Sequence, residues 1–105
     1  MTIIAVHTLE IRLPYDPGGE FEQALEAGVA CCRGSLGCLG YSSIRSDVEP
    51  RFWIVSGYWR SVGHMNNHFR SPGMAAFVDL LTSARAYLAF NSMVPLIEMA
   101  AADGN

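Results

Sequence analysis

The sequence contains no lysine, only 16% of its residues are charged, and its formal net charge is −3. Phosphate backbones are bound by clustered cations, so this composition argues against a nucleic-acid partner. No apolar stretch approaches the roughly 18 residues that span a membrane. The first residues also lack the basic flank and cleavage site of a signal peptide. We therefore expect a cytoplasmic protein that contacts neither nucleic acid nor membrane.

Cysteine is equally scarce, with only Cys31, Cys32 and Cys38 in the chain. An odd number that includes an adjacent pair is a poor disulfide framework, and no CxxC spacing occurs. These cysteines are therefore expected to be reduced thiols.

The chain also lacks internal repeats, low-complexity tracts and any linker that could separate two domains. Its 105 residues, half of them apolar, suffice for one core. We expect a single domain over residues 1–99 and a flexible tail over residues 100–105.

Two hydrophobic periods follow each other in the first third of the chain. Residues 3–13 alternate, which predicts a long strand, and residues 14–19 are rich in proline and glycine, which predicts a turn. From Glu20 the apolar residues step by three or four, acids occupy the first turn, and Arg33-Gly34 closes the pattern. This pattern predicts an amphipathic helix.

The remainder predicts a hairpin, two helices and a final strand. Residues 38–46 and 51–59 are strand-like and joined by a short polar connection. A serine is expected to cap each helix. The first helix begins after Ser61 and ends near Arg70, and the second begins at Ser71-Pro72 and has an apolar stripe that continues to Leu88. Residues 92–99 are expected to form the last strand, at an edge or with a bulge because of a proline within it.

This order predicts an α+β fold, the ferredoxin-like βαββαβ arrangement with a four-stranded antiparallel sheet. The first and third strands carry apolar residues on both faces. A sheet that is apolar on both sides needs a cover on both sides, and the chain has too few helices for two covers. We therefore predict a homodimer.

Residues 59–77, the stretch Gly37-Cys-Leu-Gly-Tyr41 and the ending Val94-Pro95 resemble the antibiotic biosynthesis monooxygenase domain family. The resemblance covers roughly residues 3–98. It implies a dimeric α/β barrel, in which two such sheets pack face to face, with a pocket between each sheet and its helices. Family members include cofactor-free oxygenases that convert phenolic or anthrone rings into quinones, and others that degrade haem.

Neither group's signature carries over residue by residue. The haem-degrading relatives have an Asn on the first strand, a Trp nine residues after the third-strand Trp, and a haem-ligating His ten residues later. The corresponding positions here are His7, His68 and Val78, and valine cannot ligate iron. The quinone-forming oxygenases have an Asn four residues before the third-strand Trp, where this chain has Val55. Haem degradation is thus disfavoured, and no cofactor is expected.

The most informative polar residue is His7, which sits mid-strand on an otherwise apolar face. It is either a buried structural histidine or a pocket-lining acid/base or ligand contact. On the helix that begins near Ser61, His68 could border a pocket and His64 is expected at the surface. The spacing of these two could hold zinc, but a closed site needs a third protein ligand, and we expect no metal.

We predict a cofactor-independent monooxygenase that oxidises a small phenol, quinol or anthrone-like compound with O₂. His7 and His68 are the candidate catalytic residues, with His7 as general base or hydrogen-bond donor. The candidate substrate-binding residues are Tyr41, Tyr58, Trp59 and Asn66. The alternatives are a non-catalytic, small-ligand-binding or stress-associated dimer of the same fold, and an enzyme of another class such as an isomerase.

Overall fold

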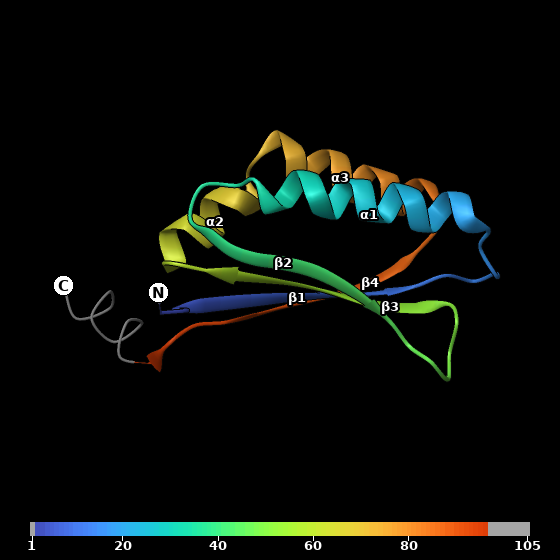
Figure 1. Cartoon of the computed structure of the whole chain (residues 1–105), viewed down its shortest axis with the longest axis horizontal. Helices are drawn as coiled ribbons and strands as arrows, with labels where there is room; N and C mark the ends of the chain where they lie inside the picture. The colour runs from blue at the N-terminus through green and yellow to red at the C-terminus, as the bar shows by residue number, and fades with distance from the viewer. Residues whose placement is uncertain (1, 97–105) are drawn as a thin grey trace.

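The chain, described over residues 2–96 by a computed structural model, forms four strands and three helices in the predicted order. Figure 1 shows the helices as one layer above the sheet. The elements are β1 (Ala5–Arg12), α1 (Gly19–Arg33), β2 (Cys38–Arg45), β3 (Phe52–Trp59), α2 (Val62–Phe69), α3 (Pro72–Ser83) and β4 (Tyr87–Met93). None of the described helices is long and apolar enough to cross a bilayer.

The sheet has the strand order β2-β3-β1-β4, and every neighbouring pair is antiparallel. β1 therefore lies between β3 and β4. Helices connect β1 to β2 and β3 to β4, and a hairpin connects β2 to β3. This arrangement confirms the predicted ferredoxin-like fold.

Both predicted serine caps are present. The Ser61 hydroxyl accepts a hydrogen bond from the His64 amide, and the Ser71 hydroxyl accepts one from the Met74 amide. A proline occupies the first turn of α3, where no amide hydrogen is needed. These caps fix where α2 and α3 begin, and so determine which side chains of α2 face the sheet.

The prediction for the last strand was wrong. The strand runs over Tyr87–Met93 instead of 92–99, and residues 97–99 lie outside the described part of the chain. α3 ends at Ser83, and Arg85 adopts a left-handed backbone (φ 61°) that turns the chain toward the sheet. Leu88 therefore lies in β4, opposite Ile11, and does not extend the helical stripe. β4 is an edge strand, as expected, but Pro95 follows it.

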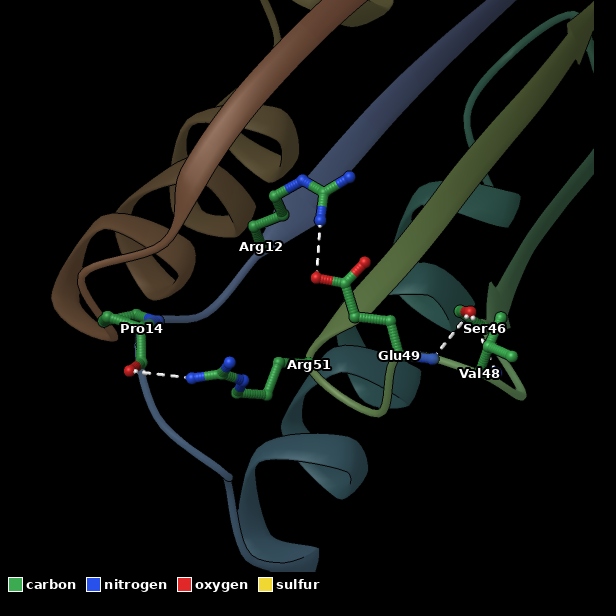
Figure 2. A network of polar contacts seen from close by, with 6 residues as sticks. All are labelled: Arg12, Pro14, Ser46, Val48, Glu49 and Arg51. Atoms are coloured by element: carbon green, nitrogen blue, oxygen red, sulfur yellow. Dashed lines mark hydrogen bonds and ion pairs between the residues drawn. The ribbon is translucent and has the colours of Figure 1, made fainter.

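The β2–β3 hairpin is tied to the end of β1 (Figure 2). The Ser46 hydroxyl accepts hydrogen bonds from the amides of Val48 and Glu49, which closes the turn. The Glu49 carboxylate then pairs with Arg12 at 2.7 Å. Both partners are about half exposed, so this pair contributes little to stability.

All three helices cover one face of the sheet, and the core lies between them. α1 contributes Leu25, Val29 and Cys32, while α3 contributes Met74, Phe77 and Leu81. Within residues 2–96 no helix covers the other face (Figure 1). We call this other side the open face; strand alternation and pairing place on it Val6, Ile44, Phe52, Ile54, Tyr58 and Met93.

Candidate functional site

Three neighbouring strands bring His7 and Tyr41 together over a glycine. His7 of β1 and Tyr41 of β2 both pair with Gly57 of β3, so all three share the helix-covered face. A Cβ atom at Gly57 would lie 2.3 Å from Cε1 of His7, which means that only glycine leaves room for the imidazole. His7 Nε2 thereby reaches the Tyr41 hydroxyl at 3.2 Å across the middle strand.

α2 supplies the next member of the cluster. His68 Nε2 lies 3.1 Å from the same Tyr41 hydroxyl, and His68 Nδ1 lies 3.0 Å from the Ser35 hydroxyl. His68 is only 3% exposed. The sequence placed it at the margin of the helix's apolar stripe, and in the structure it is one of two buried residues of α2.

Trp59, at the end of β3, completes the cluster. Its indole N–H donates to His7 Nδ1 at 2.9 Å. The indole is fully buried and its ring lies 4.8 Å from that of His68. Phe69 and Phe90 contact the His7 ring from α2 and β4, with centroid distances of 5.1 and 5.6 Å. His7 is thus enclosed by aromatic rings, and both of its ring nitrogens have side-chain partners.

Burial determines the charge state of the cluster. Desolvation by burial and, to a lesser extent, the neighbouring His68 together lower the pKa of His7 to about 4. Burial likewise lowers the pKa of His68 and raises the pKa of Tyr41. All three side chains are therefore neutral at pH 7. We call the hydrogen-bonded set Trp59, His7, Tyr41, His68 and Ser35 the buried relay.

A cavity of about 230 Å³ lies at the His68–Ser35 end of the buried relay. It is formed where the loop between α1 and β2 meets α2 and the start of α3. Its lining comprises Ser35, Leu36, His64, Asn67, His68 and Ser71. A small aromatic molecule is compatible with this volume, although ligand sites for larger compounds usually exceed about 300 Å³.

The structure brings together His7, Tyr41, Trp59 and His68 of the predicted residues. Tyr58 lies on the open face, and Asn66 is exposed on α2 outside the cavity lining. The possible contacts of these two residues with a ligand stay predictions. His64, expected at the surface, is half-buried and lines the cavity.

Sequence reasoning missed Ser35, Asn67 and Gly57. A lone glycine among the bulky residues of β3 was a usable signal, because glycine within a strand marks close approach of another group. Ser35 and Asn67 gave no such signal, since both lie outside the apolar patterns. Within residues 2–96 no group of three or more His, Cys, Asp or Glu residues could hold a metal ion.

The sequence profile described as antibiotic biosynthesis monooxygenase matches residues 4–80 of the chain. No functionally curated protein matches it significantly.

Solved structures share the fold at low identity. SnoaB, a cofactor-independent oxygenase from Streptomyces nogalater, superposes with a TM-score of 0.76 at 12% identity, covering 90% of this chain and 94% of its own. A Deinococcus radiodurans protein provisionally named an antibiotic biosynthesis monooxygenase gives 0.79 at 18%, covering 88% and 92%. A conserved protein of unknown function from Bacteroides thetaiotaomicron gives 0.77 at 14%, covering 90% and 100%. At these identities the likeness extends to the fold alone.

Proposed function

Because the chain belongs to the antibiotic biosynthesis monooxygenase family, we propose that it is a cofactor-independent monooxygenase acting on a small phenol, quinol or anthrone-like compound. The observation that carries the proposal is the cavity of about 230 Å³ bordered by His68, at the end of a buried and neutral His–Tyr–His cluster. SnoaB, which has the same fold, is named as a cofactor-independent oxygenase.

The reaction needs no group beyond the substrate and O₂. A deprotonated phenol is electron-rich enough to pass an electron to O₂, and the two radicals then combine at a ring carbon. Loss of water from the resulting hydroperoxide gives the quinone. One oxygen atom enters the ring and the other leaves in water with the ring hydrogen and the hydroxyl hydrogen, so four electrons pass from ring to O₂. The protein must orient the ring, exclude water and handle the proton.

The residues divide between these tasks. His68 borders the cavity and is the proposed proton-handling group, acting through the Ser35 hydroxyl to which it is hydrogen-bonded. His7 acts through Tyr41, to which it is hydrogen-bonded, and Trp59 holds the His7 ring. Leu36 supplies apolar contact at the cavity, whereas Trp59 and Tyr41 form the packed wall behind His68.

Oxygen uptake with a panel of phenols, hydroquinones and anthrones tests the proposal. We expect the protein, with a chelator present and no flavin added, to consume one O₂ per quinone formed from at least one compound. His68→Ala should lower the rate about 100-fold, the usual contribution of a proton-handling side chain. Asp79→Asn, an exposed change on α3, is the matched control and should leave the rate unchanged.

A non-catalytic ligand-binding dimer is the alternative, and one observation favours it. All four ring nitrogens of His7 and His68 already have partners within the chain, so both imidazoles are hydrogen-bonded without a substrate. Ligand retention with no oxygen uptake across the panel would establish this alternative and refute the monooxygenase.

We also propose that the protein is a homodimer formed through the open face. Ile44 and Ile54 are cross-strand partners there and are 69% and 37% exposed. Met93, on the far side of the same face, is 54% exposed. Apolar side chains gathered on an uncovered sheet face favour a second copy as the cover.

Light scattering on a sizing column tests the dimer. The wild type should elute at twice the 11.5-kDa chain mass, and Ile54→Glu should elute as a monomer, because a charge would be buried at the interface. Val48→Glu is the control for the added charge: this valine is 90% exposed in the hairpin turn, outside the strands that form the open face, and its variant should remain dimeric. A monomeric wild type would contradict the proposal.

A further inference from the structure

The buried relay has a direction, which is set by Trp59. An indole N–H can only donate, so His7 Nδ1 must accept from Trp59. A neutral imidazole that accepts at Nδ1 carries its hydrogen on Nε2. His7 therefore donates from Nε2 to the Tyr41 oxygen, 3.2 Å away.

Tyr41 sets the direction of the next two hydrogen bonds, which lead to the cavity. Its oxygen has accepted from His7, and its own hydrogen has three candidate acceptors: His68 Nε2 at 3.1 Å, the Met74 sulfur at 4.0 Å and the Cys32 sulfur. The imidazole nitrogen is a stronger acceptor than either sulfur. His68 then carries its hydrogen on Nδ1 and donates to the Ser35 oxygen at 3.0 Å.

The last hydrogen of the relay belongs to the Ser35 hydroxyl. Because the hydroxyl oxygen accepts from His68, its hydrogen has no hydrogen-bond acceptor among the described residues, and Ser35 lines the cavity. The other serine of the lining, Ser71, donates to the His68 carbonyl oxygen and so is already committed. The relay therefore ends at the cavity as a hydrogen-bond donor.

The rest of the cavity suits a negatively charged oxygen. No carboxylate is among the residues that line it, so nothing there repels an anion. Gly37 (φ 80°) lies beneath the His64 ring, where a Cβ would fall 2.2 Å from Cγ, so the loop can pack closely against α2. Leu36, on the same loop, gives an apolar surface for a ring.

We propose that this cavity is an oxyanion site, in which the ring oxygen of a small aromatic accepts a hydrogen bond from Ser35, so that the phenolate binds in preference to the phenol. This inference rests on the proposed function and deepens it. Ser35 becomes the residue that holds the substrate oxygen, and Trp59 and His7 become positioning residues that act through Tyr41 and His68. The ionised ring is the form that can reduce O₂.

The neutral state of both histidines supports the direction of the hydrogen bonds from Trp59 to Ser35. Burial lowers the pKa of both His7 and His68. A protonated His7 would also point an N–H at the indole N–H of Trp59, which has no lone pair to accept it. The relay thus holds a single arrangement at neutral pH.

4-Nitrophenol, whose phenolate absorbs visible light, tests the oxyanion site. Titration of the bound compound should give a pKa at least about one unit below that of the free compound, equal to a tenfold preference for the phenolate. Ser35→Ala should abolish this shift, whereas Ser35→Thr, which keeps a hydroxyl, should retain it. A shift of the same size in Ser35→Ala would overturn the proposal.

A pair of His7 variants tests the direction itself. His7→Gln can accept from Trp59 through its amide oxygen and donate to Tyr41 through its amide nitrogen, so the shift should persist. His7→Leu can neither accept nor donate, so it should reduce the preference for the phenolate over the phenol at least about threefold, although Ser35 is unchanged. Equal shifts in both variants would refute the role of the relay. Circular dichroism confirms that each variant is folded.

The outcomes separate the two proposals. Binding of 4-nitrophenol with an unchanged or raised pKa overturns the oxyanion site, while oxygen uptake by the panel would still support the monooxygenase. A phenolate preference that depends on Ser35, with no oxygen uptake, supports the oxyanion site in the non-catalytic alternative and refutes the monooxygenase. No binding of 4-nitrophenol overturns the oxyanion site.

Discussion

Lowering the pH from 7 to 4 is expected to reduce the free energy of unfolding by about 3 kcal/mol through His7 alone. Burial lowers the pKa of the folded His7 from 6.5 to about 4, and the side chain is fully buried. Between these values the unfolded chain binds a proton that the folded chain does not, so stability falls as the pH falls. The lowered pKa of His68 acts in the same direction.

Urea unfolding at a series of pH values measures this loss. His7→Gln is the control, because it keeps a donor and an acceptor at this position but does not titrate. Other groups titrate in both proteins, so the difference between the two stability profiles isolates His7. The wild type should lose stability more steeply below pH 6.5 than the variant. Parallel profiles would show that His7 has an ordinary pKa in the folded protein.

The elements that were predictable from the sequence are those with one buried side. β1 alternates strictly between buried and half-buried or exposed residues, and α1 buries Leu25, Val29 and Cys32 at helical spacing. The prediction of β4 was wrong because this strand lies at the edge of the sheet and six of its seven residues are exposed. Its sequence therefore has no period that burial would impose, and the helix before it ends without a glycine signal.

The sequence singled out His7, Tyr41, Trp59 and His68 one by one, but it could not predict that they contact one another. His7 was identified because a polar side chain on an apolar face needs a partner. Its partners Tyr41 and Trp59 lie 34 and 52 residues away in the sequence. Their contact depends on the register of three strands, which hydrophobic pattern alone cannot give. Ser35 was missed because only its contact with His68, which lies 33 residues away in the sequence, marks it as part of the cluster.

Gly57→Ala is expected to cost at least about 3 kcal/mol of folding free energy and to lower the Tm by more than about 10 °C. The added Cβ would lie 2.3 Å from His7 Cε1, 2.8 Å from His7 Nδ1 and 3.0 Å from Trp59 Nε1. The imidazole must move away, and its hydrogen bonds to Trp59 and Tyr41 would be lost inside the core. Urea unfolding and calorimetry measure the loss.

Gly40→Ala separates this clash from the general effect of alanine in a strand. Gly40 lies on the neighbouring strand β2, and its added Cβ would meet only the edge of the Tyr58 ring at 3.3 Å, so the cost should stay below about 1 kcal/mol. A double-mutant cycle with His7→Ala then assigns the cause. If the methyl group acts by displacing the imidazole, Gly57→Ala should cost much less when His7 is already alanine. An additive pair would mean that Gly57 is required by the backbone of β3, and that the space it leaves for His7 is incidental.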